Sequence, residues 1–316
     1  MAIQASTAAE APLARRGPTG RRRNETILAW LFSAPALLLL AVFLLVPFLM
    51  AFGLAFTDQR LIPNPNLPTR FVAFRNFIRL LEDETFHRAL LNNFLFAAVV
   101  VPLQSSFALL LAILVNQKLR FSNVFRTVYF SPVVTIMVVV AIVWTFLYNP
   151  GEGFINTFIQ TISFGRLGGY DWLNSTKLAF PAIMLLSIWQ GVGFQMVIYL
   201  AGLQDIPDEL YEAAQVDGAN RWQQFWNVTL PQLRNTTIFV VIATTILAFK
   251  LFTQVWVMTR GGPQEATMTA MILVYKEGFK QLRVGYASAI SIVFFLIVLG
   301  VSLLQRVFLR EERTVS

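Results

Sequence analysis

The chain of 316 residues contains no cysteine and a single histidine, His87. Without cysteine it can form no disulfide, thiolate nucleophile or Cys-ligated zinc site. One histidine also argues against a His-based metal centre or a Ser-His-Asp triad. No G-x-x-x-x-G-K-[ST] pattern occurs, so the chain lacks the loop with which many ATPases hold phosphate. These absences predict a chain with no catalytic residues, metal or cofactor of its own.

Charge is also scarce. Charged residues make up 13% of the chain and hydrophobic residues 56%, whereas ordinary soluble domains carry about 25% charged residues. The apolar residues concentrate in six stretches of 22 to 31 residues, and a helix of about 20 apolar residues crosses a bilayer. The sequence therefore predicts an all-α integral membrane protein with six transmembrane helices. The stretches are Ile27–Thr57, Ala89–Gln117, Thr127–Gly151, Leu178–Gln204, Asn235–Thr259 and Val284–Gln305.

The chain has a net charge of +8, and its basic residues lie mostly at the ends of these stretches and in the N-terminal segment. That distribution favours anchoring at a membrane surface over nucleic-acid binding. We interpret residues 1–26 as a basic, disordered tail that is retained, and residues 310–316 as a short C-terminal end. Basic residues near span ends place the tail and the Lys118–Arg126 loop in the cytoplasm. Residues 152–177, which include several glycines, are expected to form an irregular external loop.

Segment 205–234 predicts two short helices joined by a turn. Asp205 is a candidate N-cap for the first helix, with Pro207 in its first turn. Gly218 is free to adopt a positive φ at the helix end, and Asn220 can cap the second helix. A helix pair packed under the bundle is the simpler interpretation, but a loop this rich in aromatics should expose an apolar patch of the kind that binds partners. The aromatic and aliphatic positions of the second helix are Trp222, Phe225, Trp226 and Leu230.

The string EAAQVDGANRWQQFWNVTLP, which begins at Glu212, resembles the EAA loop of binding-protein-dependent ABC importers. Four more stretches, in the same order along the chain, resemble permeases of the carbohydrate-uptake branch, especially the first permease of maltose- and glycerol-phosphate-type systems. The resemblance covers about residues 27–309. The four stretches are FRTVYFSPVV at Phe125–Val134, IWQGVGFQMVIYLAGLQDIP at Ile188–Pro207, VMTRGGPQEATM at Val257–Met268 and GYASAIS at Gly285–Ser291.

The resemblance implies the type I permease fold, with a six-helix permease domain at residues 27–309 and a cytoplasmic coupling loop at 205–234. It implies a multi-pass protein of the bacterial inner membrane that imports a sugar or sugar-like solute. The implied partners are a second, non-identical permease, two ATPase subunits that carry ATP and Mg, and an extracytoplasmic solute-binding protein. In this family the loop docks into a cleft of the ATPase, where Glu212 would meet a basic group. The implied coupling residues are Glu212, Ala213, Ala214, Asp217 and Gly218.

Polar residues inside spans are candidates for the solute pathway. The fourth stretch combines amides, glycines and aromatic rings, which suit the hydroxyls and apolar face of a sugar. Interhelical hydrogen bonds and small-residue packing explain the same residues without a pathway. Weaker candidates are Gln104, Gln254 and Tyr199, and Gly261–Pro263 would shape an external turn that contacts the binding protein. The pathway candidates are Ser187, Gln190, Gly191, Gly193, Phe194, Gln195 and Lys250.

An ion-coupled secondary transporter is the alternative function. That class usually needs an intramembrane carboxylate or ion site, and no Asp or Glu lies within the six stretches. An intramembrane enzyme would need a His, Cys or acid constellation that is missing here. The identity of the solute and the role of Lys250 stay open at this point.

Because the chain has no native cysteine, its orientation can be tested by a single substitution. We expect a cysteine at Asn220 to react with a membrane-impermeant thiol reagent only after the cells are opened, since the loop is predicted to be cytoplasmic. A cysteine at Arg166, in the predicted external loop, should react in intact cells. Labelling of the Asn220 position from outside would overturn the topology.

Overall fold

The computed structural model describes residues 21–62, 68–117 and 122–309. Residues 1–20 of the predicted tail, residues 118–121 of the predicted inner loop and the C-terminal end at 310–316 lie outside the described residues. Within the described ranges every regular element is a helix, apart from one antiparallel bridge between Thr57 and Phe71. The chain divides into two compact units, residues 1–51 and 52–316, and each is considered by itself.

The first unit is built on one apolar helical stretch. It consists of α1 (Arg21–Leu40), a π-helical segment η1 (Ala41–Leu45) and α2 (Val46–Leu54). The helix begins at Arg21, so residues 21–26, the last part of the predicted tail, are helical. Pro47 lacks the N–H that an α-helix needs, and the wider π-helical turn directly before it accommodates the missing bond. The apolar stretch therefore continues through its prolines.

The second unit contains the remaining helices. Its long elements are α4 (Glu84–Asn116), α8 (Ala179–Gln204), α12 (Arg234–Phe249) with α13 (Thr253–Met258), and α15 (Val284–Phe308). Together with Thr26–Leu54, these give five helical stretches that are long and apolar enough to span a membrane among the residues described. The shorter elements are α3 (Arg75–Glu82), α5 (Ser122–Val134), α6 (Met137–Leu147), α7 (Phe154–Ile162), α9 (Asp208–Val216), α10 (Arg221–Gln224), η2 (Phe225–Thr229), α11 (Leu230–Gln232), α14 (Ala270–Tyr275) and η3 (Lys276–Lys280).

The third predicted span is a bent pair rather than one straight helix. Helices α5 and α6 meet at a break of two residues and differ in direction by 97°. Pro132 cannot donate to the carbonyl of Val128, and the Ser131 hydroxyl binds that carbonyl instead at 3.1 Å. If this bent pair is counted as one span, the described residues contain six candidate spans, as predicted. The third span, however, is broken rather than straight.

Segment 152–177, which the sequence predicts to be an irregular external loop, is also more regular than predicted, because α7 occupies its first half. Its irregular part follows that helix, where Gly165, Gly168 and Gly169 all have positive φ. Asn156, fully buried, organises the region: its side-chain amide donates to the Tyr170 carbonyl at 2.9 Å and accepts from the Tyr170 N–H at 3.2 Å. A side chain inside α7 thus fixes the loop that returns to α8.

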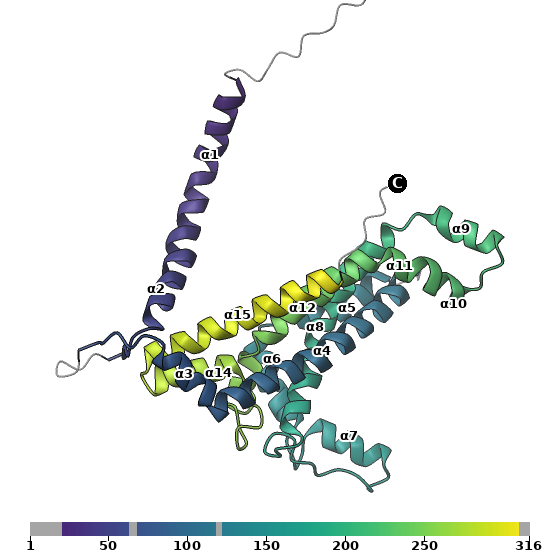
Figure 1. The fold of residues 1–316 in the computed structure, drawn as a ribbon. Coiled ribbons are helices and arrows are strands. Elements are labelled where there is room, and N and C mark those ends of the chain that lie inside the picture. Colours follow the sequence, from purple (N-terminus) through teal and green to yellow (C-terminus); the bar gives the residue numbers. More distant parts are fainter. Residues whose placement is uncertain (1–20, 63–67, 118–121, 310–316) are drawn as a thin grey trace, which may run out of the picture. The chain divides into compact units, whose positions relative to one another are not determined.

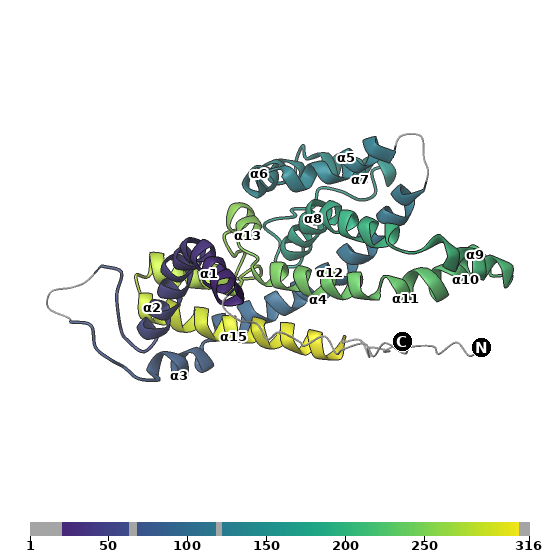
Figure 2. The ribbon, with the colours of Figure 1, turned by 90° about the horizontal axis from the view of Figure 1, so that it is seen from above.

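The centre of this unit is the packing of α4 against α8 (Figure 1). Viewed from above, α5 lies beyond α8 on one side, and α12 followed by α15 lies on the other (Figure 2). Ala108 and Ala112 are fully buried on α4, and small residues of this kind let membrane helices approach closely. On α8, a Cβ added to Gly193 would overlap the backbone carbonyl of Tyr129, so α5 rests directly on that glycine.

Helix α12 ends at a break, Lys250–Phe252, before α13 begins. Asn93, fully buried on α4, donates to the Phe249 carbonyl at 3.1 Å and accepts from the Ala270 N–H at 2.9 Å. Thr269 donates to the Leu251 carbonyl at 3.0 Å. The break is therefore a defined structure whose backbone groups are bound by buried side chains.

We expect Asn93→Leu to destabilise the protein by about 2–6 kcal/mol, because two buried backbone groups lose their partner at roughly 1–3 kcal/mol each. The midpoint of thermal unfolding in detergent should fall by roughly 5–10 °C. Leu91→Ala, at an exposed side chain of the same helix, is the control and should change it little. Equal midpoints for wild type and Asn93→Leu would show that the break does not depend on this residue.

Candidate functional site

The coupling loop, residues 205–234, forms the predicted pair of short helices at one end of the unit (Figure 1). Helix α9 ends at a turn in which Gly218 has φ of +80°, a conformation that side chains with a Cβ rarely adopt. The second helix starts with a capping box: Asn220 accepts from the Gln223 N–H at 2.9 Å, and the Gln223 side chain accepts from the Asn220 N–H at 2.8 Å. Both turn predictions are confirmed.

The predicted cap of the first helix is wrong. Asp205 is the C-cap residue of α8, and α9 begins after Pro207, which has no side chain able to cap it. In place of a cap, two acidic residues in the first turn, Asp208 and Glu209, stabilise the positive end of the helix dipole. The aromatic second helix is also divided, into α10, η2 and α11.

On one side the coupling loop packs against the bundle, where Tyr211 and Val228 contact the apolar cluster of α4 and α8. The Tyr211 hydroxyl and the Thr229 hydroxyl lie 2.9 Å apart and tie α9 to η2. A hollow of about 400 Å³ separates the loop from the ends of α4 and α8, with Asn116 and Leu203 among its lining residues. The loop therefore has a fixed internal geometry and adjoins the two central helices.

The other side of the coupling loop is open. Glu212, Ala213, Asp217 and Gly218 are exposed and Ala214 is half-buried. Among the described residues, no basic group lies within ion-pairing distance of Glu212. Two large aromatic side chains also face outward on this loop: Trp222 is 68% exposed, Trp226 is 50% exposed and their rings lie 5.7 Å apart. A carboxylate, a left-handed turn and exposed aromatics together suit a protein partner.

The second candidate region is a cavity of about 230 Å³ in the membrane part of the unit. Among the predicted pathway residues it gathers Ser187, Gln190 and Gly191 of α8, together with the weaker candidates Gln104 and Gln254. The rest of the lining, which the sequence did not single out, is mostly apolar and includes no charged residue. It comprises Phe96, Val100, Met137, Thr244, Leu247, Ala248 and Leu251.

Hydrogen bonds fix the polar side chains of this cavity. Gln254 donates to the Ser187 hydroxyl at 3.2 Å, and Ser187 donates to the carbonyl of Ile183 at 2.8 Å. Gln190 donates to the Pro132 carbonyl at 3.4 Å, at the bend between α5 and α6. A Cβ added to Gly191 would overlap the side-chain amide of Gln104. The missing side chain of Gly191 thus leaves the space that the Gln104 amide occupies.

The other predicted pathway residues lie elsewhere. Gly193 packs against the α5 backbone, and Gln195 is buried and donates to the hydroxyl of Thr244. Phe194 is 46% exposed, and Lys250 is exposed at the end of α12. Tyr199, one of the weaker candidates, is buried in the apolar cluster nearer the coupling loop.

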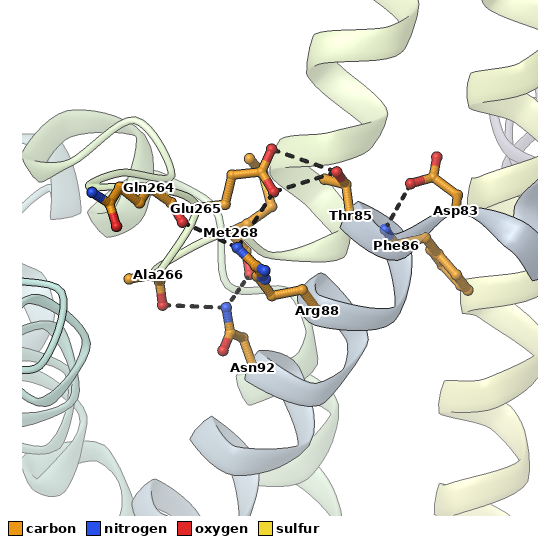
Figure 3. Close-up of polar contacts among 9 residues, drawn as sticks. All are labelled: Asp83, Thr85, Phe86, Arg88, Asn92, Gln264, Glu265, Ala266 and Met268. Atoms are coloured by element: carbon orange, nitrogen blue, oxygen red, sulfur yellow. Dashed lines mark hydrogen bonds and ion pairs between the residues drawn. The ribbon is translucent and has the colours of Figure 1, made fainter.

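The external turn predicted at Gly261–Pro263 belongs to a loop that is fastened to the start of α4 (Figure 3). Asn92 donates to the Met268 carbonyl at 2.8 Å and to the Ala266 carbonyl at 3.3 Å. Arg88 donates to the Gln264 carbonyl at 3.2 Å and lies 3.9 Å from the Glu265 carboxylate. This loop and the coupling loop adjoin opposite ends of α4, which is about 50 Å long at 1.5 Å per residue.

Several helices long and apolar enough to span a membrane, a cavity between them with an uncharged lining and an exposed loop between two of them are typical of a multi-pass membrane transport component. Residues 104–314 match the family described as binding-protein-dependent transport system inner membrane component. The chain therefore belongs to this family of inner membrane components.

Similar proteins match over almost the whole chain. The probable ABC transporter permease protein YurN of Bacillus subtilis is 36% identical over 292 residues, which cover 92% of this chain and 98% of that protein. The lactose transport system permease protein LacF of Rhizobium radiobacter is 34% identical, with 92% of this chain and 97% of that protein covered. A crystal structure of a bacterial ABC transporter involved in alginate import has a chain of the same fold, with a TM-score of 0.78, 23% identity and 93% and 100% coverage.

We expect Gly191→Leu to abolish most solute uptake while leaving membrane insertion near the wild-type level. The Cβ alone would displace the flexible amide of Gln104, and the rest of the leucine side chain would occupy the cavity. Gly300→Leu, where an added Cβ meets nothing within 4 Å, is the matched control and should transport normally. Uptake is measured with radiolabelled solute; unchanged uptake by Gly191→Leu would remove the cavity from the pathway.

Proposed function

We propose that this chain is the membrane-spanning permease subunit of an ATP-driven importer that moves a sugar or sugar-like solute across the bacterial cytoplasmic membrane. A separate ATPase hydrolyses ATP with Mg and acts on the chain through the coupling loop. The observation that carries the proposal is the open side of that loop, where Glu212, the left-handed turn at Gly218 and two exposed tryptophans lie together on a short segment between two spans.

The solute class follows from the cavity. Its lining combines three glutamine amides and a serine hydroxyl with apolar side chains, and it contains no charged group. Amides and hydroxyls bind the hydroxyls of a neutral sugar, whereas apolar groups pack on its ring face. A carboxylate for ion coupling is absent from this lining, which favours an ATP-driven importer over the ion-coupled alternative. The name of the similar lactose permease LacF agrees with a carbohydrate.

The complete transporter would contain a second, non-identical permease, two ATPase subunits and an extracytoplasmic solute-binding protein. This chain would contribute the permease domain at residues 27–309, with its coupling loop, N-terminal tail and C-terminal end in the cytoplasm. The external loop around Gly261–Pro263 would face the binding protein. Neither nucleic acid nor a cofactor of the chain's own has a part in this proposal.

Transport would follow from rigid-body movement. Closure of the ATPase dimer would displace the coupling loop, which is internally fixed by the Tyr211–Thr229 contact and adjoins α4 and α8. The same two helices contribute Gln104 and Gly191 to the cavity. Displacement of the loop would therefore change which side of the membrane the cavity opens to.

We expect Glu212→Lys and Gly218→Val each to abolish solute-stimulated ATP hydrolysis without preventing insertion or association with the second permease. Lysine places a positive charge opposite a basic group, which costs at least the roughly 1.5–3 kcal/mol of the lost charged contact. Valine at φ of +80° costs roughly 1–2 kcal/mol and widens the turn. ATPase co-purification and stimulation of ATP hydrolysis by loaded binding protein are the measurements.

Two matched controls separate coupling from folding. Gly165→Val introduces the same strain at φ of +78° in the external segment, again with no neighbour within 4 Å. Glu152→Lys reverses an exposed charge on that same segment. Both controls should retain ATPase association. Normal coupling by both test variants would refute the role of the loop.

A further inference from the structure

A second polar cavity, of about 290 Å³, lies outside both regions described above. We define the arginine pocket by the residues of its lining. It occurs where the segment after the first span and helix α3 meet the start of α15, near the end of α4 that is remote from the coupling loop (Figure 1). The lining residues are Asp58, Gln59, Arg60, Val72, Arg75, Asn76, Arg79, Arg283 and Tyr286.

The walls of the arginine pocket are held by backbone contacts. Asn76 donates to the carbonyls of Ala55 and Thr57, both at 2.8 Å. The Gly285 N–H donates to the Gln59 carbonyl at 3.0 Å, which joins the start of α15 to the same segment. The pocket is therefore a formed feature of the unit, since three separate segments are joined around it.

Positive charge in the arginine pocket exceeds the negative charge available to it. The lining contains four arginines and a single carboxylate, Asp58, one oxygen of which already accepts from the Arg70 N–H at 2.6 Å. Arg283 lies 3.2 Å from Glu277, and Arg79 stacks 4.1 Å from the ring centre of Tyr286. Among the described residues, no carboxylate lies within ion-pairing distance of Arg60 or Arg75. A group of guanidinium donors with this charge excess suits a phosphate.

Helix α3 relates the arginine pocket to the bilayer. Arg75 and Arg79 line the pocket, whereas the side chains of Phe74, Ile78 and Leu81 are 64%, 57% and 72% exposed. These apolar positions follow one another at intervals of four and three residues, which places them on one face of the helix. An amphipathic helix directly before a span lies in the interface, with its apolar face toward the acyl chains and its arginines at the headgroups.

We propose that the arginine pocket binds the phosphate of an anionic phospholipid in the leaflet opposite the coupling loop. Arg60 and Arg75 would bind the phosphate oxygens, Arg79 would be held in place by Tyr286, and the exposed apolar face of α3 would pack on the acyl chains. Soluble phosphate offers the same oxygens but leaves that apolar face without a partner. This site does not depend on which solute the protein carries.

The test uses the full chain, purified with its associated subunits, and native mass spectrometry during titration with phosphatidylglycerol or phosphatidylcholine. The wild type should retain phosphatidylglycerol in preference to phosphatidylcholine. Arg60→Gln combined with Arg75→Gln should weaken phosphatidylglycerol binding about tenfold or more. The charge-conserving Arg60→Lys and Arg75→Lys pair should bind with intermediate affinity, because lysine keeps the charge but loses the two-pronged contact.

The matched control is Arg166→Gln with Lys177→Gln, which removes two positive charges from the external segment on the same side of the membrane. It should retain the lipid as the wild type does. The site would be refuted if the control pair lost as much lipid as the test pairs. It would also be refuted if neither test pair lost any lipid. Displacement of the lipid by inorganic phosphate at similar concentration would assign the pocket to a soluble anion. Unchanged lipid binding with lost association of another subunit would assign it to a protein contact. Either result would overturn the lipid proposal.

Discussion

Non-helical backbone in or beside a membrane needs protein partners for its N–H and carbonyl groups, because the bilayer core supplies none. In this protein four buried asparagines supply many of those partners. Asn76 binds the segment after the first span, Asn92 the external loop, Asn93 the break after α12 and Asn156 the loop beyond α7. Each binds backbone groups that lie between helices or at a helix end. The irregular segments next to these four side chains depend on this one interaction, whereas the coupling loop is held by its own contacts.

Helix α4 carries two of the four asparagines and connects the functional regions. Its first turns hold the external loop through Asn92 and Arg88, its middle contributes Gln104 to the cavity, and its last residues adjoin the coupling loop. Because α4 is continuous from Glu84 to Asn116, these regions lie along a single stiff element. A rotation of α4 against its neighbours would therefore displace residues in all three regions together.

Much of this arrangement could be predicted from the sequence, because the signals involved are local. The spans could be predicted from hydropathy. The turn at Gly218 and the helix cap at Asn220 could be predicted from the chemistry of those two residues. The bend between α5 and α6 could not be predicted, because a proline such as Pro132 is also found in membrane helices that stay straight. Which α8 residues would line the cavity could not be predicted either, for a different reason. Gly191 and Gly193 differ in role only because one meets a side chain and the other meets the backbone of α5, and hydropathy does not specify which neighbour faces each residue.

The break at Lys250–Phe252 also gives the cavity a wall of a particular kind. Leu247 and Ala248 line the cavity from before the break, and Leu251 and Gln254 line it from the break and from α13. In an unbroken helix these residues would be displaced together as one rod. Here the two parts are joined by three residues, whose backbone is held by side-chain hydrogen bonds from α4 and from Thr269. The cavity wall therefore consists of two separate helical parts, and a displacement of α13 relative to α12 would change its shape.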